Sequence, residues 1–152
     1  MSSNPALQPP DAAVGADASS GRITFLSPSQ PVNMEPDWFE LATSGHFFIR
    51  RRFDVLQHIG KVFLRPEWQF LEVGCGHGLL QRELHTRAGL TVDGFDLCLP
   101  ALLRNETERG RLYYYNIFDC APAFAERYDV IFLFDVLEHI EDDAGFLKTC
   151  LL

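Results

Sequence analysis

The chain has 152 residues, of which 47% are hydrophobic and 22% charged, values that suit one globular domain. Its 13 Lys and Arg residues against 21 Asp and Glu residues leave a net charge of -8, which argues against a protein that tracks nucleic-acid phosphates with a basic surface. The four cysteines are spaced too widely for a zinc site or a disulfide scaffold, and no segment resembles a membrane span or a signal peptide. We therefore expect a soluble, cytoplasmic protein.

The N-terminal residues 1–36 are rich in Ser, Pro, Ala and Asp and have little apolar periodicity. Such a segment offers little burial to offset the entropy lost on ordering, so we expect a disordered or weakly ordered tail. The apolar cluster at residues 23–26 is an exception that could dock on a surface. Residues 37–152 are expected to form one domain, with helices at 37–65 and an alternating core at 66–152.

Segments typical of helices and strands alternate along this domain. Apolar residues recur at helical spacing after residue 47, and short apolar runs bounded by Gly, Pro or charged residues predict strands. The expected order is helix 47–63, strand 69–73, helix 78–88, strand 90–95, helix 100–108, strand 112–117, strand 128–134 and a helix from 138 to the end. This alternation predicts a doubly wound, Rossmann-like α/β fold with a mostly parallel sheet.

The expected sheet has about four strands and is incomplete. The strand at 128–134 is the most apolar of them, as in a strand paired on both edges, yet no later strand follows it. The last helix runs to Leu152 without a cap or a breaker. We therefore expect a C-terminally truncated domain whose later strands are missing, marginally stable by itself and able to self-associate through its open sheet edge.

A glycine-rich turn joins the first expected strand of the core to the following helix. It places Gly74, Gly76 and Gly78 at alternate positions, where the absence of side chains lets a ligand lie against the turn and the amides that open the helix. A dinucleotide fingerprint would need glycine at position 79, which is Leu79 here, and Glu72 would repel a pyrophosphate. The turn therefore favours a cationic ligand without phosphates.

Asp96 ends the second expected strand of the core, 22 positions after Gly74. In nucleotide-binding α/β folds, an acid about 20 residues beyond the glycine turn holds the hydroxyls of a ribose. The alternatives are an exposed acid at a strand end, and Asp93, which precedes the end of the strand. We expect Asp96 to be the ribose ligand.

Three motifs follow one another between residues 70 and 143. They are an E-x-G-x-G-x-G loop at Glu72–Gly78, an acidic strand end at Gly94–Asp96, and a strand followed by D-V-L-E-H-I at Tyr128–Ile140. In this order they resemble the motifs of class I S-adenosylmethionine-dependent methyltransferases, in particular the ubiquinone-biosynthesis and type 11–12 group. The resemblance implies that 37–65 form a lid, in which His46–Arg52 can bring a basic residue near the cofactor carboxylate, and that 66–152 form an incomplete cofactor-binding core.

The resemblance also implies S-adenosylmethionine as the cofactor and gives roles to individual residues. Glu72 would face its amino group, and Asp96 would bind its ribose. Asn116 stands where the family usually has an acid that meets the adenine amino group, with Asp119 as the alternative; an amide accepts this hydrogen bond more weakly. The other cofactor-binding positions that it implies are Gly74, Cys75, Gly76, Gly78, Leu97, Ile117, Phe134 and Asp135.

Asp135, Glu138 and His139 follow the last expected strand, at spacings that share one face of a helix. In similar ubiquinone-pathway enzymes, residues at such places can hold a divalent metal near the acceptor. The favoured interpretation has no metal: Asp135 caps an acidic helix start, and His139 packs beside the cofactor. His139 is also the candidate general base, because the ordinary pKa of histidine lies near 6.5.

The predicted function is therefore methyl transfer from S-adenosylmethionine to an unidentified acceptor, with a small molecule favoured and a hydroxyl group as one option. The 152-residue chain alone is expected to be inactive or nearly so. Two alternatives stand beside this hypothesis. One is a non-catalytic fragment or pseudoenzyme that keeps cofactor binding, and the other is an NAD-dependent oxidoreductase or epimerase.

Overall fold

The structure is a computed structural model that describes residues 20–43, 45–60 and 64–151. Its centre is a sheet of five parallel strands in the order β1-β4-β3-β2-β5. The strands are β1 (Ile23–Phe25), β2 (Phe70–Val73), β3 (Val92–Asp96), β4 (Leu112–Tyr114) and β5 (Val130–Leu133). The predicted Rossmann-like α/β fold with a parallel sheet is confirmed.

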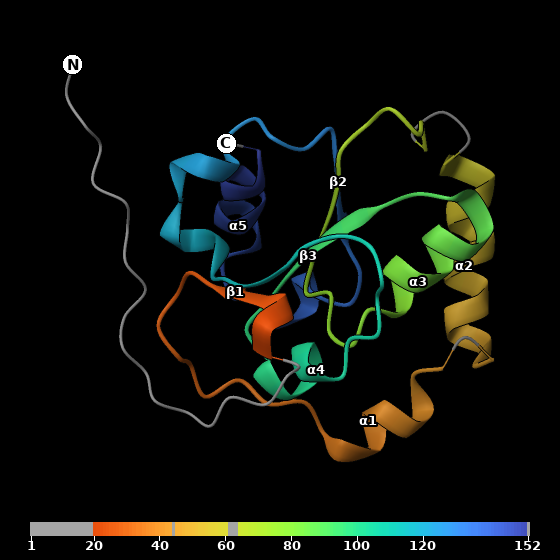
Figure 1. Cartoon of the computed structure of the whole chain (residues 1–152), viewed down its shortest axis with the longest axis horizontal. Coiled ribbons are helices and arrows are strands. Elements are labelled where there is room, and N and C mark those ends of the chain that lie inside the picture. The colour runs from red at the N-terminus through yellow and green to blue at the C-terminus, as the bar shows by residue number, and fades with distance from the viewer. Residues whose placement is uncertain (1–19, 44, 61–63, 152) are drawn as a thin grey trace.

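Helices cover both faces of the sheet, with α5 on one side and α2 and α3 on the other (Figure 1). The helices are α1 (Pro36–Leu41), α2 (Phe47–Ile59), α3 (Leu79–Ala88), α4 (Leu99–Leu103) and α5 (Asp143–Cys150). Short 3-10 turns are η1 (Ser20–Arg22), η3 (Ile117–Asp119), η4 (Pro122–Phe124) and η5 (Leu137–His139). None of the helices in the described ranges is long and apolar enough to cross a membrane.

Alternation along the strands divides the core into two layers. Phe70 and Phe132 project from neighbouring strands to the side of α2 and α3, whereas Leu71 and Phe95 project to the side of α5. Helix α2 turns its buried stripe toward the first of these layers, as its periodicity predicts. All four residues of β2 are buried, and this strand lies inside the sheet between β3 and β5.

Strand β1 is the main departure from the sequence-based expectation of about four strands. It lies in the region expected to be a tail, where the 23–26 cluster docks by pairing with the outer edge of β4. Ile23 is buried, while the next two residues are exposed. Three residues carry too little periodicity to predict a strand, and the pairing exists only because β4 offers its edge. Residues 1–19 of the expected tail lie outside the described residues.

Several other boundaries differ from those expected. The helix expected at 100–108 ends at Leu103, and the strand expected at 112–117 ends at Tyr114. The helix expected from residue 138 begins at Asp143, because Asp142 caps it by accepting a hydrogen bond from the Gly145 amide at 2.9 Å. The end of the expected helix 47–63 falls on residues outside the described ranges. These are differences of local hydrogen bonding, and they leave the order of the core elements as predicted.

Strand β5 forms one end of the sheet in the part of the chain that the structure describes. It pairs with β2 in register from Phe70↔Val130 to Val73↔Leu133, and only Phe132 of its four residues is buried. The contrast with the fully buried β2 follows from this position at the edge.

Candidate functional site

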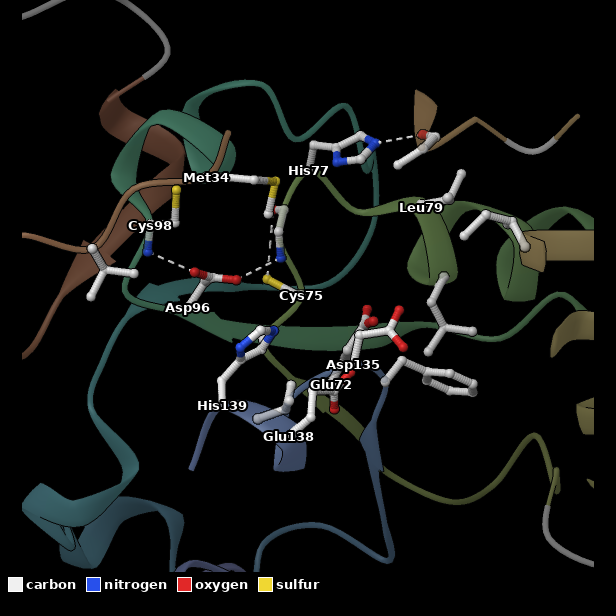
Figure 2. A pocket seen from close by; sticks show the side chains of 18 of the residues that line it. Met34, Glu72, Cys75, His77, Leu79, Asp96, Cys98, Asp135, Glu138 and His139 are labelled. Carbon is white, nitrogen blue, oxygen red and sulfur yellow. Dashed lines mark hydrogen bonds between the residues drawn. The ribbon is translucent and has the colours of Figure 1, made fainter. Parts of the chain in front are cut away.

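A cavity of about 810 Å³ opens where the parallel strands end at their carboxyl sides. Its walls come from the end of β2 and the following turn, the start of α3, the end of β3, the segment after β5, helix α2, and residues 32–35. This is the edge at which open α/β sheets bind ligands, and the volume is in the range of pockets for small molecules and cofactors. Figure 2 shows side chains from these separate segments pointing into one space.

The glycine turn forms one wall of the cavity. Gly74, Gly76 and Gly78 all have positive φ, at 76°, 52° and 80°. A methyl group on Gly74 would overlap Val136, and one on Gly78 would overlap the side-chain amide of Asn105. The turn therefore needs glycine both for its left-handed backbone and for the close approach of neighbouring groups.

Glu72 is the most unusual residue of the cavity. It is 4% exposed on β2, an interior strand of the sheet, and its Oε2 has no hydrogen-bond partner among the described residues. Burial raises the pKa of the Glu72 carboxyl well above its ordinary value, and the nearby Asp96 carboxylate adds to the rise. An unpartnered carboxylate that lines a cavity is suited to a ligand with a positive charge and N–H donors.

Asp96 lies at the end of β3 and is held by backbone amides. Gly76 N–H donates to its Oδ2 and Cys98 N–H donates to its Oδ1, each at 2.6 Å (Figure 2). Burial raises the pKa of Asp96, whereas the amides of residues Cys98, Gly76 and Leu97 oppose the rise. The carboxylate is thereby fixed in orientation at the cavity wall, and each oxygen keeps lone pairs for a further donor.

The segment after β5 forms the opposite wall and does not have the predicted helical geometry. Asp135 has φ 54°, and only Leu137–His139 form a 3-10 turn, so Asp135, Glu138 and His139 do not share one helical face. Asp135 caps no helix; it forms an ion pair with Arg52 of α2. In the described ranges no group of three His, Cys, Asp or Glu side chains is gathered closely enough to hold a metal ion. His139 is exposed and points into the cavity (Figure 2).

The N-terminal part of the chain forms a further wall of the cavity. Residues 32–35 pass along its wall, and Met34 extends toward the glycine turn (Figure 2). His77 of this turn is hydrogen-bonded through Nε2 to the Ala42 carbonyl oxygen at 3.0 Å, with the ring of Phe39 packed edge-on against it. These contacts fasten α1 to the glycine turn, a relation that local sequence patterns do not predict.

Most of the residues expected at the site come together. Those that line the cavity are Glu72, Gly74, Cys75, Gly76, Asp96, Phe134, Asp135, Glu138 and His139. Four others, Gly78, Leu97, Asn116 and Ile117, lie outside this wall in the part of the chain that the structure describes. Asn116 caps η3, with its Oδ1 accepting from the Phe118 amide at 3.1 Å. Residues 32–35 also line the cavity and were not predicted from the sequence. Arg52, in the segment from which the resemblance implies a basic residue near the cofactor, lines it as well.

Comparison with known families identifies this architecture. A family described as "Methyltransferase domain" matches residues 15–151. The chain belongs to this family of methyltransferase domains. The match includes β1 and residues 32–35, so the N-terminal wall of the cavity is part of the matched region of the methyltransferase domain.

Curated relatives of this methyltransferase domain include ubiquinone biosynthesis O-methyltransferases. The one from Actinobacillus pleuropneumoniae is 32% identical over 90 residues, which cover 53% of this chain and 38% of the relative. The one from Pseudomonas savastanoi pv. phaseolicola is 33% identical over 86 residues, which cover 53% of this chain and 37% of the relative. The matched part thus spans well under half of the length of these relatives.

Among solved structures, the methyltransferase domain is similar to the plantazolicin methyltransferase BpumL in complex with SAH. The TM-score is 0.57 at 17% sequence identity, and the match covers 77% of this chain and 49% of that chain. At this level of identity the likeness concerns the fold, and it agrees with the Rossmann-like arrangement described above.

Proposed function

We propose that this methyltransferase domain binds S-adenosylmethionine and transfers its methyl group to an acceptor. The observation that carries the proposal is the buried, unpartnered Oε2 of Glu72 at the wall of the cavity. The amino group of the cofactor would supply both the hydrogen bond and the positive charge that this oxygen lacks. The cofactor carries no phosphate, which suits a turn flanked by two carboxylates, Glu72 and Asp96.

Further residues have a place in this proposal. Asp96 would accept hydrogen bonds from the ribose hydroxyls with the lone pairs that its two amide partners leave free. Arg52, which lines the cavity, would bind the cofactor carboxylate. Its ion pair with Asp135 would then be partly broken. Asn116, just beyond β4, would accept from the adenine amino group through the second lone pair of its Oδ1. The glycine turn would leave room for the methionine part.

Methyl transfer requires little covalent chemistry from the protein itself. S-adenosylmethionine, when bound, supplies a methyl group already activated by the positive sulfonium. The residues of the cavity walls would hold donor and acceptor in line. His139, which points into the cavity, would take a proton from a hydroxyl acceptor. The curated relatives are named ubiquinone biosynthesis O-methyltransferases, which supports oxygen methylation of a small acceptor. We also propose a cytoplasmic location for this chain.

A binding titration tests the proposal against its main rival, NAD binding. We expect calorimetry to show that SAH, S-adenosylhomocysteine, the demethylated product of the cofactor, binds the chain. NADH should bind at least tenfold more weakly, because its two phosphates would lie near Glu72 and Asp96. Equal or tighter binding of NADH would contradict a methyl-transfer site.

Replacing Asp96 by Ala should weaken SAH binding by about 1.5 to 3 kcal/mol, roughly 10- to 150-fold, because charge-assisted hydrogen bonds to the ribose would be lost. Asp93→Asn is the matched control on the same strand. Asp93 bonds to the Tyr128 hydroxyl at 3.0 Å and to the Arg111 amide at 2.8 Å, away from the cavity wall. Its SAH affinity should stay at the parental value. If calorimetry gave the two variants equal affinities, Asp96 would not be the ribose ligand.

A further inference from the structure

The hydroxyl group of Ser27 connects the N-terminal segment, residues 22–35, to the turn that follows β4. Ser27 Oγ accepts a hydrogen bond from the Asn116 amide at 2.8 Å and donates to Asp119 Oδ2 at 2.5 Å. The Ser27 amide also donates to the Tyr114 carbonyl oxygen at 3.3 Å. Ser27 thus bonds to the last residue of β4, to the residue that caps η3 and to the carboxylate at the end of η3.

The same segment continues from Ser27 into the wall of the cavity. The Gln30 amide donates to the Tyr114 hydroxyl at 2.7 Å, and residues 32–35 then line the cavity. Met34 lies over the glycine turn, where its Cε would be 3.5 Å from a methyl group on Gly76 (Figure 2). The attachment at Ser27 therefore lies between strand β1 and this wall, and it links the wall to the turn that contains Asn116.

The segment is also attached at its start. The Arg22 guanidinium donates to the carbonyl oxygens of Asn105 and Thr107, and Ile23 is buried against Leu112 and Tyr114. With these contacts holding the strand itself, the removal of one hydroxyl at Ser27 would loosen the turn after β4 without detaching β1.

We propose that Ser27 is a positioning residue for cofactor recognition: it holds the Asn116 turn in place for the adenine and ties that turn to the cavity wall at residues 32–35. The inference rests on the proposed function. Asn116 presents its Oδ1 in a fixed direction only while its own backbone is fixed, and the bond from its amide to Ser27 supplies that restraint. Asp119, the other candidate for the adenine, is restrained by the same hydroxyl.

The test compares Ser27→Ala with two matched variants. Ser27→Thr keeps the hydroxyl, and Ser29→Ala removes an exposed hydroxyl two residues farther along the segment, outside the cavity wall. Titrations use SAH and its inosine analogue, in which a carbonyl oxygen replaces the adenine amino group. Ser27→Ala should lower the affinity for SAH about five- to tenfold and that for the analogue much less, so that the preference for SAH shrinks. Ser27→Thr and Ser29→Ala should keep the parental preference.

Two outcomes would overturn the inference. The first is an affinity of Ser27→Ala for SAH equal to that of Ser29→Ala. The second is an equal loss of affinity for SAH and for the inosine analogue, because a purely structural contact would leave the preference unchanged. Thermal unfolding of each variant checks that it is folded. If Ser27→Ala does not fold, Ser27→Thr still tests the inference, because loss of the parental preference in a variant that keeps the hydroxyl would contradict it.

Hydrogen exchange separates this inference from the proposed function. Without any ligand, Ser27→Ala should speed exchange at the Asn116 amide relative to Ser29→Ala, since that amide loses its acceptor. If the parent failed to bind SAH while this difference was observed, the proposed function would fail and the attachment at Ser27 would stand. Binding of SAH by the parent with no difference in exchange between the variants would overturn the role of Ser27 alone.

Discussion

Glu72→Gln should reduce the affinity for SAH by about a hundredfold while leaving the protein at least as stable as its parent. The loss is large because a buried charge pair with the cofactor amino group, about 3 kcal/mol, would be replaced by a neutral amide contact. Stability should not suffer, because the parent buries an unpartnered carboxyl oxygen whose desolvation is unfavourable. Calorimetry and thermal unfolding measure the two effects on the same sample.

Glu67→Gln is the control for this substitution, since Glu67 is exposed and lies outside the cavity wall. It makes the same chemical change and should leave the affinity for SAH unaltered. Parental affinity in Glu72→Gln would show that the carboxylate does not meet the cofactor.

The raised pKa of Glu72 makes both binding and stability depend on pH. Between the ordinary pKa of a glutamate and the raised pKa of Glu72, the folded protein holds a proton that the unfolded chain has released. The free energy of unfolding of the ligand-free protein therefore falls as pH rises through this window. The affinity for SAH should rise over the same window, because the amino group of the ligand binds the ionised carboxylate. Glu72→Gln should remove this contribution to the pH dependence of the free energy of unfolding and of the affinity for SAH.

Gly78→Ala should lower the free energy of unfolding by about 3 kcal/mol and weaken SAH binding as well. A methyl group there would be strained by the positive φ of 80° and would overlap the buried Asn105 amide. Asn105 Nδ2 donates to Gln81 Oε1 at 2.8 Å, so its displacement would also disturb the buried contacts of α3 beneath the glycine turn. Urea unfolding and SAH titration measure the two effects.

Gly89→Ala separates backbone strain from this overlap. Gly89 ends α3 with a positive φ of 68°, but a methyl group there would meet nothing within 4 Å. It should cost about 1 kcal/mol, the penalty for a left-handed alanine, with no change in the affinity for SAH. If both variants lost the same free energy of unfolding, the overlap with Asn105 would not contribute to the destabilisation of Gly78→Ala.

The centre of the site could be predicted from the sequence because its geometry is local. A strand, a glycine turn and a helix in succession bring Glu72 and Gly76 to the carboxyl edge of the sheet. Asp96 ends the neighbouring parallel strand, and parallel strands end at the same edge, so its arrival beside the glycine turn follows from topology alone. The residue types then indicate a cationic ligand without phosphates.

Predictions that assumed continued regular structure were less successful. Asp135 and His139 were expected on one helical face, but the positive φ of Asp135 turns the chain before η5 begins. The strand expected to reach residue 117 ends at Tyr114, and the Asn116 side chain accepts from the Phe118 amide, while its contact with the adenine stays a prediction. In both places a local hydrogen bond or turn competes with the regular element, and such competition leaves little trace in the pattern of apolar residues.

The sequence by itself determined the parallel α/β core, the glycine turn and the two carboxylates at the edge of the sheet, because strand–turn–helix units are encoded by contacts between near neighbours. Only the tertiary structure decided which distant segments complete the cavity. Strand β1 pairs with β4 across more than 80 residues of chain, and Arg52 reaches Asp135 over a similar separation. Such pairings depend on which edge and which charge remain free once the core has folded, and no short stretch of sequence contains that information.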